Sequence, residues 1–138
     1  MKPFPQYLIA AALLAAGMAH AADLTIDVTG LKNAKGKVLV AVYDRAEGFL
    51  KQPARVAAAD AQEGKVSVAI TGLPVGDYAF TAFHDQNGNG TLDKNPVGMP
   101  VEPYGFSNDA VGHYGPPSFD QARVHLSEKG SVATINLH

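Results

Sequence analysis

The chain of 138 residues contains no cysteine and no tryptophan, has almost no net charge and contains only one long apolar run. Without cysteine, the protein cannot form a disulfide, a thiolate metal site, a cysteine nucleophile or a lipidated cysteine. The 11 Lys and Arg residues nearly balance the 13 Asp and Glu residues, which argues against a nucleic-acid binder because such a protein needs a basic face. These absences exclude several classes of protein without selecting one.

The apolar run near the N-terminus has the layout of a secretory signal peptide. Lys2 provides a positive charge, residues 8–16 are uninterruptedly apolar, and Ala21 closes an Ala-His-Ala tripeptide with small residues where a signal peptidase reads them. The run is much shorter than the roughly 20 residues that span a bilayer, which disfavours a membrane anchor. We therefore expect residues 1–21 to be a cleaved signal peptide and residues 22–138 to be one exported domain, periplasmic or secreted, with no membrane span.

Short segments in which apolar and polar residues alternate recur along the rest of the chain, separated by turns that contain glycine. This period of two is typical of half-buried β-strands. The predicted strands are residues 24–28, 36–43, 55–59, 66–70, 78–84, 119–126 and 131–137. Residues 127–130 predict a hairpin between the last two, and residues 46–50 are expected to form one helical turn. About seven short strands in a domain of this size predict an all-β sandwich.

One long segment, residues 86–118, has no predicted strand and contains six glycines and five prolines. Structureless connections longer than about 15 residues are uncommon in compact domains, and they are usually functional or disordered. Because Tyr104, Phe106 and Tyr114 lie within the segment, we expect an ordered loop that packs over one end of the sandwich.

The start of this loop, DQNGNGTLD at residues 85–93, matches the first nine positions of an EF-hand-type calcium loop. Oxygen-bearing side chains stand at positions one, three, five and nine, which are Asp85, Asn87, Asn89 and Asp93. Gly90 stands at the sharp-turn position, and Thr91 is expected to offer its backbone carbonyl at position seven. Calcium takes six to eight oxygen ligands, which alternate residues of a tightly curled loop can supply.

Two features differ from a true EF-hand. Position twelve, normally a bidentate Glu, is Pro96, and the preceding segment is predicted to be a strand. Glu102 is the candidate for the missing carboxylate, and we expect a modest affinity, about 10⁻⁴ to 10⁻³ M. The alternative is an ion-free turn, because Asn and Asp side chains also bond to their own backbone and Gly accepts a positive φ.

The histidines give weaker signals. His84 adjoins the calcium-like loop and His113 lies in the long segment, but no two histidines have the local spacing of metal ligands. The chain also has no nucleophile elbow, phosphate-binding loop or dinucleotide-binding motif in the required setting. The sequence therefore favours a protein that is not an enzyme.

Four motifs, taken together, resemble those of a known family. They are GLPVGDY at 72–78, HDQNGNGTLD at 84–93, PYGFSN at 103–108 and GPPSF at 115–119. This combination resembles domain-of-unknown-function family 2141, a family of exported bacterial proteins, over roughly residues 24–137. The resemblance implies an immunoglobulin-like or prealbumin-like (transthyretin-like) sandwich with one long inserted loop, and it implies no established activity. The closing Tyr-Arg-Gly-Ser of the related hydroxyisourate hydrolases has no counterpart here.

We therefore expect an exported, non-enzymatic module whose 86–118 loop is ordered by calcium and presents a binding surface. The predicted calcium ligands are Asp85, Asn87, Asn89, Thr91, Asp93 and Glu102. The expected partner is a protein or a glycan of the cell envelope, contacted by Tyr104, Phe106, Asn108 and Tyr114. Two alternatives stay open: a structural or adhesion unit that uses exposed sheet edges, and a hydrolase with His84, His113 and Asp109 under the long loop.

Overall fold

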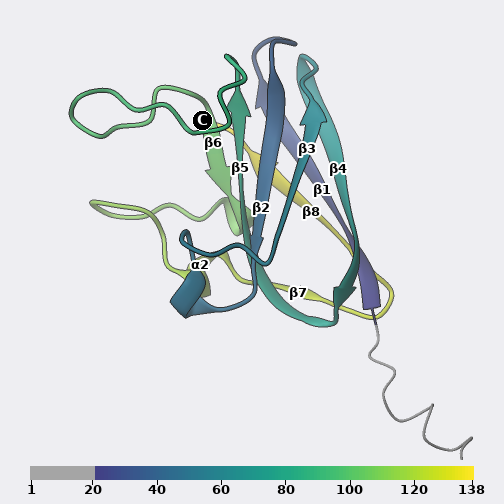
Figure 1. The fold of residues 1–138 in the computed structure, drawn as a ribbon. Coiled ribbons are helices and arrows are strands. Elements are labelled where there is room, and N and C mark those ends of the chain that lie inside the picture. Colours follow the sequence, from purple (N-terminus) through teal and green to yellow (C-terminus); the bar gives the residue numbers. More distant parts are fainter. Residues whose placement is uncertain (1–20) are drawn as a thin grey trace, which may run out of the picture.

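The computed structural model describes residues 21–138, which form two facing β-sheets (Figure 1). The first sheet has three strands in the order β4-β1-β8, which are Gly64–Pro74, Ala21–Leu31 and Ser131–Asn136. β1 pairs with β4 in antiparallel and with β8 in parallel orientation. The first and last strands of the domain therefore lie next to each other. The predicted signal peptide falls almost entirely on residues 1–20, outside the described residues.

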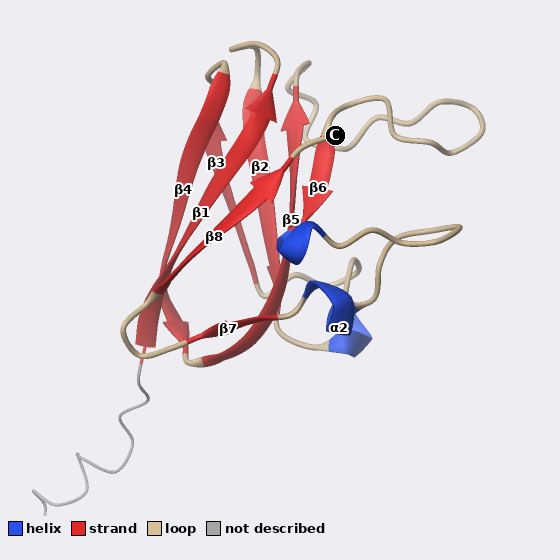
Figure 2. Ribbon diagram, turned by 180° about the vertical axis from the view of Figure 1, so that it is seen from behind, coloured by secondary structure: helices blue, strands red, loops and turns tan. Residues whose placement is uncertain are grey.

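The second sheet has five strands. The order is β3-β2-β5-β6, which are Arg55–Asp60, Lys37–Tyr43, Gly76–Asp85 and Tyr104–Phe106, and β7 (Val124–Leu126) pairs with the start of β5. All pairings in this sheet are antiparallel. Three short helical segments connect the strands, namely η2 (Ala46–Gly48), η3 (Ser107–Asp109) and α2 (Phe119–Ala122) (Figure 2). The all-β sandwich predicted from the sequence is confirmed.

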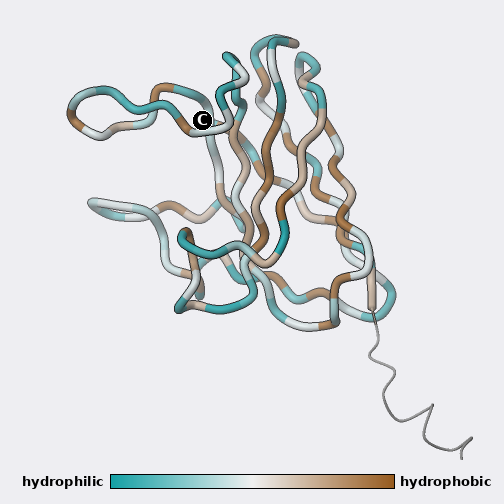
Figure 3. Tube along the Cα trace, in the orientation of Figure 1, coloured by the Kyte–Doolittle hydropathy of each residue, from teal (hydrophilic) through white to brown (hydrophobic). Residues whose placement is uncertain are grey.

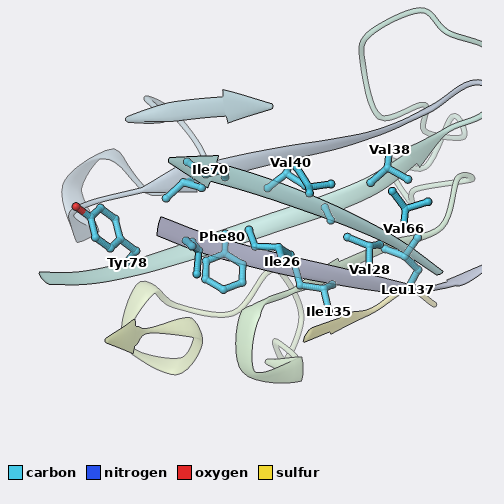
Figure 4. Packing of buried hydrophobic residues seen from close by; sticks show 14 of the residues in the cluster. Ile26, Val28, Val38, Val40, Val66, Ile70, Tyr78, Phe80, Ile135 and Leu137 are labelled. Atoms are coloured by element: carbon cyan, nitrogen blue, oxygen red, sulfur yellow. The ribbon is translucent and has the colours of Figure 1, made fainter. Parts of the chain in front are cut away.

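The core lies between the two sheets and follows from the alternation of apolar residues along the strands. In β1, for example, Leu24, Ile26 and Val28 are buried and the residues between them are not, and Figure 4 shows Ile26 and Val28 within the core. The same alternation in β2, β4 and β5 brings their apolar side chains to the inner face, and Figure 3 shows apolar segments along the strands and polar tips at the turns. Phe80 at the centre of β5 is completely buried. Side-chain packing thus holds the sheets together without a disulfide.

The prediction of one strand over residues 119–126 is partly wrong. Residues Phe119–Ala122 form the short helix α2, and only Val124–Leu126 is a strand. The helix starts there because Ser118 Oγ accepts a hydrogen bond from Gln121 N and Gln121 Oε1 accepts one from Ser118 N, which is a capping box.

The predicted hairpin over residues 127–130 is also wrong. These residues do turn, since Gly130 N donates to Ser127 O over 2.9 Å, but the strands on either side do not pair with each other. β7 pairs with β5 in the larger sheet, whereas β8 pairs with β1 in the smaller one. The turn therefore carries the chain from one sheet to the other.

The predicted long loop of residues 86–118 is interrupted by the short strand β6, which the sequence did not reveal. β6 pairs with β5, and it lies close to β8: a Cβ on Gly105 would stand 2.6 Å from Ile135 Cγ2 and 2.7 Å from Asn136 O. Glycine is therefore required in the middle of β6. The strand divides the segment into two shorter connections, which extend from the same side of the sandwich in both views (Figures 1 and 2).

Candidate functional site

The predicted calcium loop, which we call the 85–93 loop, begins with the last residue of β5. The carboxylate of Asp85 is almost completely buried at 2% exposure, and its Oδ2 accepts a hydrogen bond of 2.8 Å from Gly90 N. The other oxygen, Oδ1, is buried and has no hydrogen-bond partner within residues 21–138. Gly88 and Gly90 both have positive φ angles of 72° and 81°, which let the chain curl around Asp85.

The amide side chains of the loop surround the carboxylate of Asp93. Asn89 Nδ2 donates to Asp93 Oδ1 over 2.6 Å, and Asn87 Nδ2 donates to Asp93 Oδ2 over 2.5 Å. The amide oxygens accept from the backbone, Asn87 Oδ1 from Asn89 N and Asn89 Oδ1 from Thr91 N. The ion-free interpretation of the sequence predicts such bonds between the Asn side chains and the loop backbone. The structure therefore gathers Asn87, Asn89 and Asp93 into one cluster whose polar groups bond to one another and to the loop backbone.

Glu102 joins this cluster although it is nine residues further along the chain. Its side chain is buried, its Oε2 accepts from Gln86 N over 2.8 Å and its Oε1 accepts from Asp93 N over 3.1 Å. Glu102 thus fastens both ends of the 85–93 loop. The sequence predicted Glu102 as a distant calcium ligand. In the structure, its carboxylate accepts hydrogen bonds from two backbone N–H groups.

No three His, Asp or Glu side chains converge on a metal position anywhere in residues 21–138. An ion in the 85–93 loop would therefore draw on the amide oxygens of Asn87 and Asn89 as well as on carboxylates. Thr91, whose carbonyl was the other predicted ligand, is exposed at the surface. Amide and carbonyl oxygens suit hard cations such as calcium, whereas transition metals favour imidazole and thiolate.

The histidines of the proposed hydrolase lie in different surroundings. His84 is fully buried on the inner face of β5, with Nε2 2.6 Å from the carbonyl oxygen of Lys35 and with no partner for Nδ1. His113 is exposed in the connection after η3, and the carboxylate of Asp109 accepts from Asn136 Nδ2 at 2.9 and 3.0 Å. No hydrogen bond of the described chain links these three residues.

The motif PYGFSN has a structural explanation. Ser107 is fully buried, accepts a hydrogen bond of 3.0 Å from Phe80 N and donates to Ala122 O. Asn108, which has a φ of 61°, donates from Nδ2 to Arg123 O over 2.6 Å. Asn108 is thus exposed as predicted, but its side-chain amide ties η3 to the end of α2.

An apolar groove that the sequence did not reveal lies on the outer face of the five-stranded sheet. Two rows of register partners cross the sheet there: Ala58, Leu39 and Phe83 in one, and Val56, Ala41 and Thr81 in the other. These residues line an open groove of about 500 Å³, which we call the outer groove. The signal was present in the segment KVLVAVY, because a strand that is apolar on both faces is typical of a sheet with both faces covered.

The outer groove is bordered by the 85–93 loop, the α2 region and β6. Gly90 of the 85–93 loop lines one end. At the other end, Tyr43 and Ala79 are covered by Phe119 and Ala122 of the α2 region. On the β6 side, Tyr104 and Phe106 continue the two rows, with their ring centroids 6.0 Å apart and an edge-to-face angle of 89°.

The covered end of the groove changes the titration of one phenol. Burial raises the pKa of Tyr43 above its ordinary value of 10.0, while a hydrogen bond with the Thr81 side chain opposes this shift. Tyr43 therefore stays neutral at physiological pH, and the groove around it contains no charge from this group.

The comparisons with known proteins identify the family. No curated protein and no solved structure matches the chain. The family described as "Uncharacterized protein conserved in bacteria (DUF2141)" matches residues 26–134. The match extends from within β1 to within β8, so it includes both sheets, the 85–93 loop and the outer groove. The chain therefore belongs to the DUF2141 family.

Proposed function

We propose that the protein is an exported, non-enzymatic binding module in which a calcium ion orders the 85–93 loop beside the outer groove. The observation that carries the proposal is the buried carboxylate of Asp85, one oxygen of which lacks a partner in the described chain. A carboxylate oxygen removed from water without a hydrogen bond is costly, and a bound cation supplies the missing interaction.

The neighbours of Asp85 support a hard cation. Asn87, Asn89 and Asp93 are joined by side-chain hydrogen bonds in the loop that starts at Asp85, and they occupy the odd-numbered positions that calcium loops use. Each amide oxygen now accepts one hydrogen bond from a backbone N–H, and it has a second lone pair with which it could bind an ion. In this proposal, calcium replaces the amide hydrogens that now bind Asp93.

The 85–93 loop connects the ion to a binding surface. Gly90 both donates its N–H to Asp85 and lines the outer groove, so an ion at Asp85 fixes one wall of the groove. The groove is mainly apolar, and its β6 side has two aromatic rings. These features support an apolar segment of an envelope protein, or the apolar face of a sugar ring, as the ligand.

Thermal unfolding with calcium and with a chelator tests the metal site. We expect about 10 mM calcium to raise the melting temperature of the wild type by roughly 5 to 10 °C, which corresponds to a dissociation constant of about 0.1 to 1 mM. Asp85→Asn retains an acceptor for Gly90 N and should fold, but it should lose the calcium-dependent shift. Asp93→Asn, closer to the surface, provides a second variant of the same cluster.

The matched control is Asp120→Asn, because Asp120 is a carboxylate on α2 with a side chain that is 77% exposed. This variant should keep the full shift with calcium. Equal melting temperatures of the wild type in calcium and in chelator would refute the metal site, as would a full shift in Asp85→Asn. Metal analysis of the purified protein then identifies the bound ion.

A further inference from the structure

Directly after the 85–93 loop, residues 94–101 form a protruding hairpin, which we call the apolar hairpin. Lys94 and Pro100 form the bridge that closes it. Its side chains are unusually apolar for a protruding segment: Val97 is 83% exposed, and Met99 and Val101 are each 60% exposed. In Figure 1 this hairpin extends away from the sheets beside the upper end of β6.

A second segment protrudes on the same side of the sandwich. Residues 110–117 extend below the apolar hairpin and apart from it in both views (Figures 1 and 2), and they contain Val111, 69% exposed, and Tyr114, which is fully exposed. Five of the nine large hydrophobic residues exposed in the described chain therefore lie in these two segments. Scattered exposed apolar residues are ordinary, whereas such a concentration on protruding tips marks an interaction surface.

The backbone of the apolar hairpin is unusually well satisfied. Pro96 and Pro100 have no N–H group, and the remaining five N–H groups of residues 95–101 all find acceptors within residues 93–101. The bonds are Asn95 N to Met99 O, Val97 N and Met99 N to Asn95 Oδ1, Gly98 N to Asn95 O, and Val101 N to Asp93 O. The amide donors of this segment can therefore leave water without losing their partners, which removes part of the cost of entry into lipid.

We propose that the apolar hairpin and the 110–117 segment dock into the surface of a lipid membrane. Residues 95–101 and 110–117 contain no Asp, Glu, Lys or Arg, and uncharged apolar tips are suited to the region below the lipid headgroups. The hairpin also offers a protein partner no free amide donor within residues 95–101. Tyr114 is the residue type that prefers the interface between headgroups and acyl chains, and the exposed Lys94 is placed at the base of the hairpin to meet lipid phosphates.

This docking is distinct from spanning. None of the helices in residues 21–138 is long and apolar enough to cross a membrane. The apolar area on the two tips is small, so the attachment is reversible. The hairpin is closed by its own hydrogen bonds, so the proposal does not depend on calcium binding at Asp85.

A single tryptophan reports insertion directly, because the natural chain has none. Met99→Trp places the reporter on the apolar hairpin, and Val132→Trp places a control at a residue of β8 that is 72% exposed. Vesicles of phosphatidylethanolamine and phosphatidylglycerol should shift the emission of Met99→Trp to shorter wavelength and protect it from iodide quenching. Val132→Trp should show neither effect. An unchanged Met99→Trp spectrum, or an equal shift in the control, would overturn the proposal.

Vesicle sedimentation gives an independent measurement. The double variant Val97→Ser/Met99→Ser should fold normally because both side chains are exposed, and it should partition to the vesicles about tenfold more weakly. Val132→Ser should partition like the wild type. All proteins are purified in the same processed form, so N-terminal residues cannot cause the difference.

The two proposals are separated by repeating the sedimentation in chelator. Binding that persists in chelator and in Asp85→Asn supports the membrane proposal whatever the outcome of the calcium experiment. A wild type that remains in the supernatant with and without calcium refutes membrane docking, even where calcium raises the melting temperature. Equal partition of the double variant and the wild type would also refute it, because the hairpin tip would then make no contribution.

Discussion

The two sheets differ in what their outer faces carry. On the three-stranded sheet, the outward residues are mostly polar or charged, as in Asp27, which accepts from Ser67 Oγ at 2.5 Å and lies 3.7 Å from Lys65 Nζ. On the five-stranded sheet, β2 and β5 are apolar on both faces, and their outer residues line the outer groove. One sheet is built to face water and the other to be covered on both sides. Function is therefore expected on the larger sheet and on the loops at its margins.

The strongest test compares the two faces of β5 at neighbouring apolar positions. Phe80 is completely buried between the sheets, whereas Phe83 faces the outer groove and is only partly buried. We expect Phe80→Ala to lower the free energy of unfolding by about 3 to 5 kcal/mol, because it leaves a cavity in the core. Phe83→Ala should cost about 1 kcal/mol, because only part of its surface is removed from water.

Urea denaturation of both variants measures this difference. Similar losses of stability would mean that the outer groove is packed as firmly as the core, which contradicts the contrast between the two faces.

The next test concerns the side where the two sheets approach each other. A Cβ on Gly105 would stand 2.6 Å from Ile135 Cγ2, so Gly105→Ala forces β6 away from β8. We expect a loss of about 2 to 3 kcal/mol in the free energy of unfolding. Gly76→Ala is the control, because no heavy atom lies within 4 Å of its added Cβ and its φ is not positive.

Gly76→Ala should change the stability by less than about 0.5 kcal/mol. If Gly105→Ala is equally mild, β6 is held only by β5 and the two sheets are not tied together on this side.

The smallest effect is expected at the ion pair between Lys37 and Asp60, at the margin of the outer face. The hydrogen bond and charge of Lys37, 2.8 Å away, hold the pKa of Asp60 below its ordinary value of 3.8. A carboxyl with a lowered pKa stabilises the fold above pH 3.8, and this contribution disappears as the pH falls through the lowered pKa. Asp60→Asn should therefore lower the melting temperature slightly at pH 7.

At a pH well below the ordinary pKa of Asp60, the wild type and Asp60→Asn should melt at the same temperature. Both side chains are mostly exposed, so the effect at pH 7 is close to the limit of detection. A large effect at neutral pH would show that this margin is more shielded from water than its exposure indicates.

The sequence predicted the parts of the fold that depend on local alternation. The buried faces of β1, β2 and β4 follow directly from apolar residues at every second position, as at Ile26 and Val68, and the structure confirms them. The helix at Phe119–Ala122 was missed, although the Ser118 and Gln121 spacing of a capping box was present as a local signal. The apolar residues of that segment also fit a strand, and this pattern outweighs the capping signal in the sequence.

The features that the sequence did not predict depend on pairing between distant residues. β6 has only three residues, and it becomes a strand because β5 and β8 lie on either side of it. At residues 127–130 the chain passes from the larger sheet to the smaller one because β8 pairs in parallel with β1. The residues of the turn do not indicate this distant pairing. The hydrogen bonds between Asn87, Asn89 and Asp93 are local to the 85–93 loop, whereas those of Glu102 to the backbone depend on the tertiary fold.

The parallel pairing of β1 with β8 also has a kinetic consequence. β1 is the central strand of its sheet, and one of its two partners is made of the last residues of the chain. The contact order is therefore high, and the three-stranded sheet cannot be completed before residues 131–136 have been synthesised. In the proposed export of an unfolded polypeptide, this late closure would keep the sheet open while the earlier strands cross the membrane.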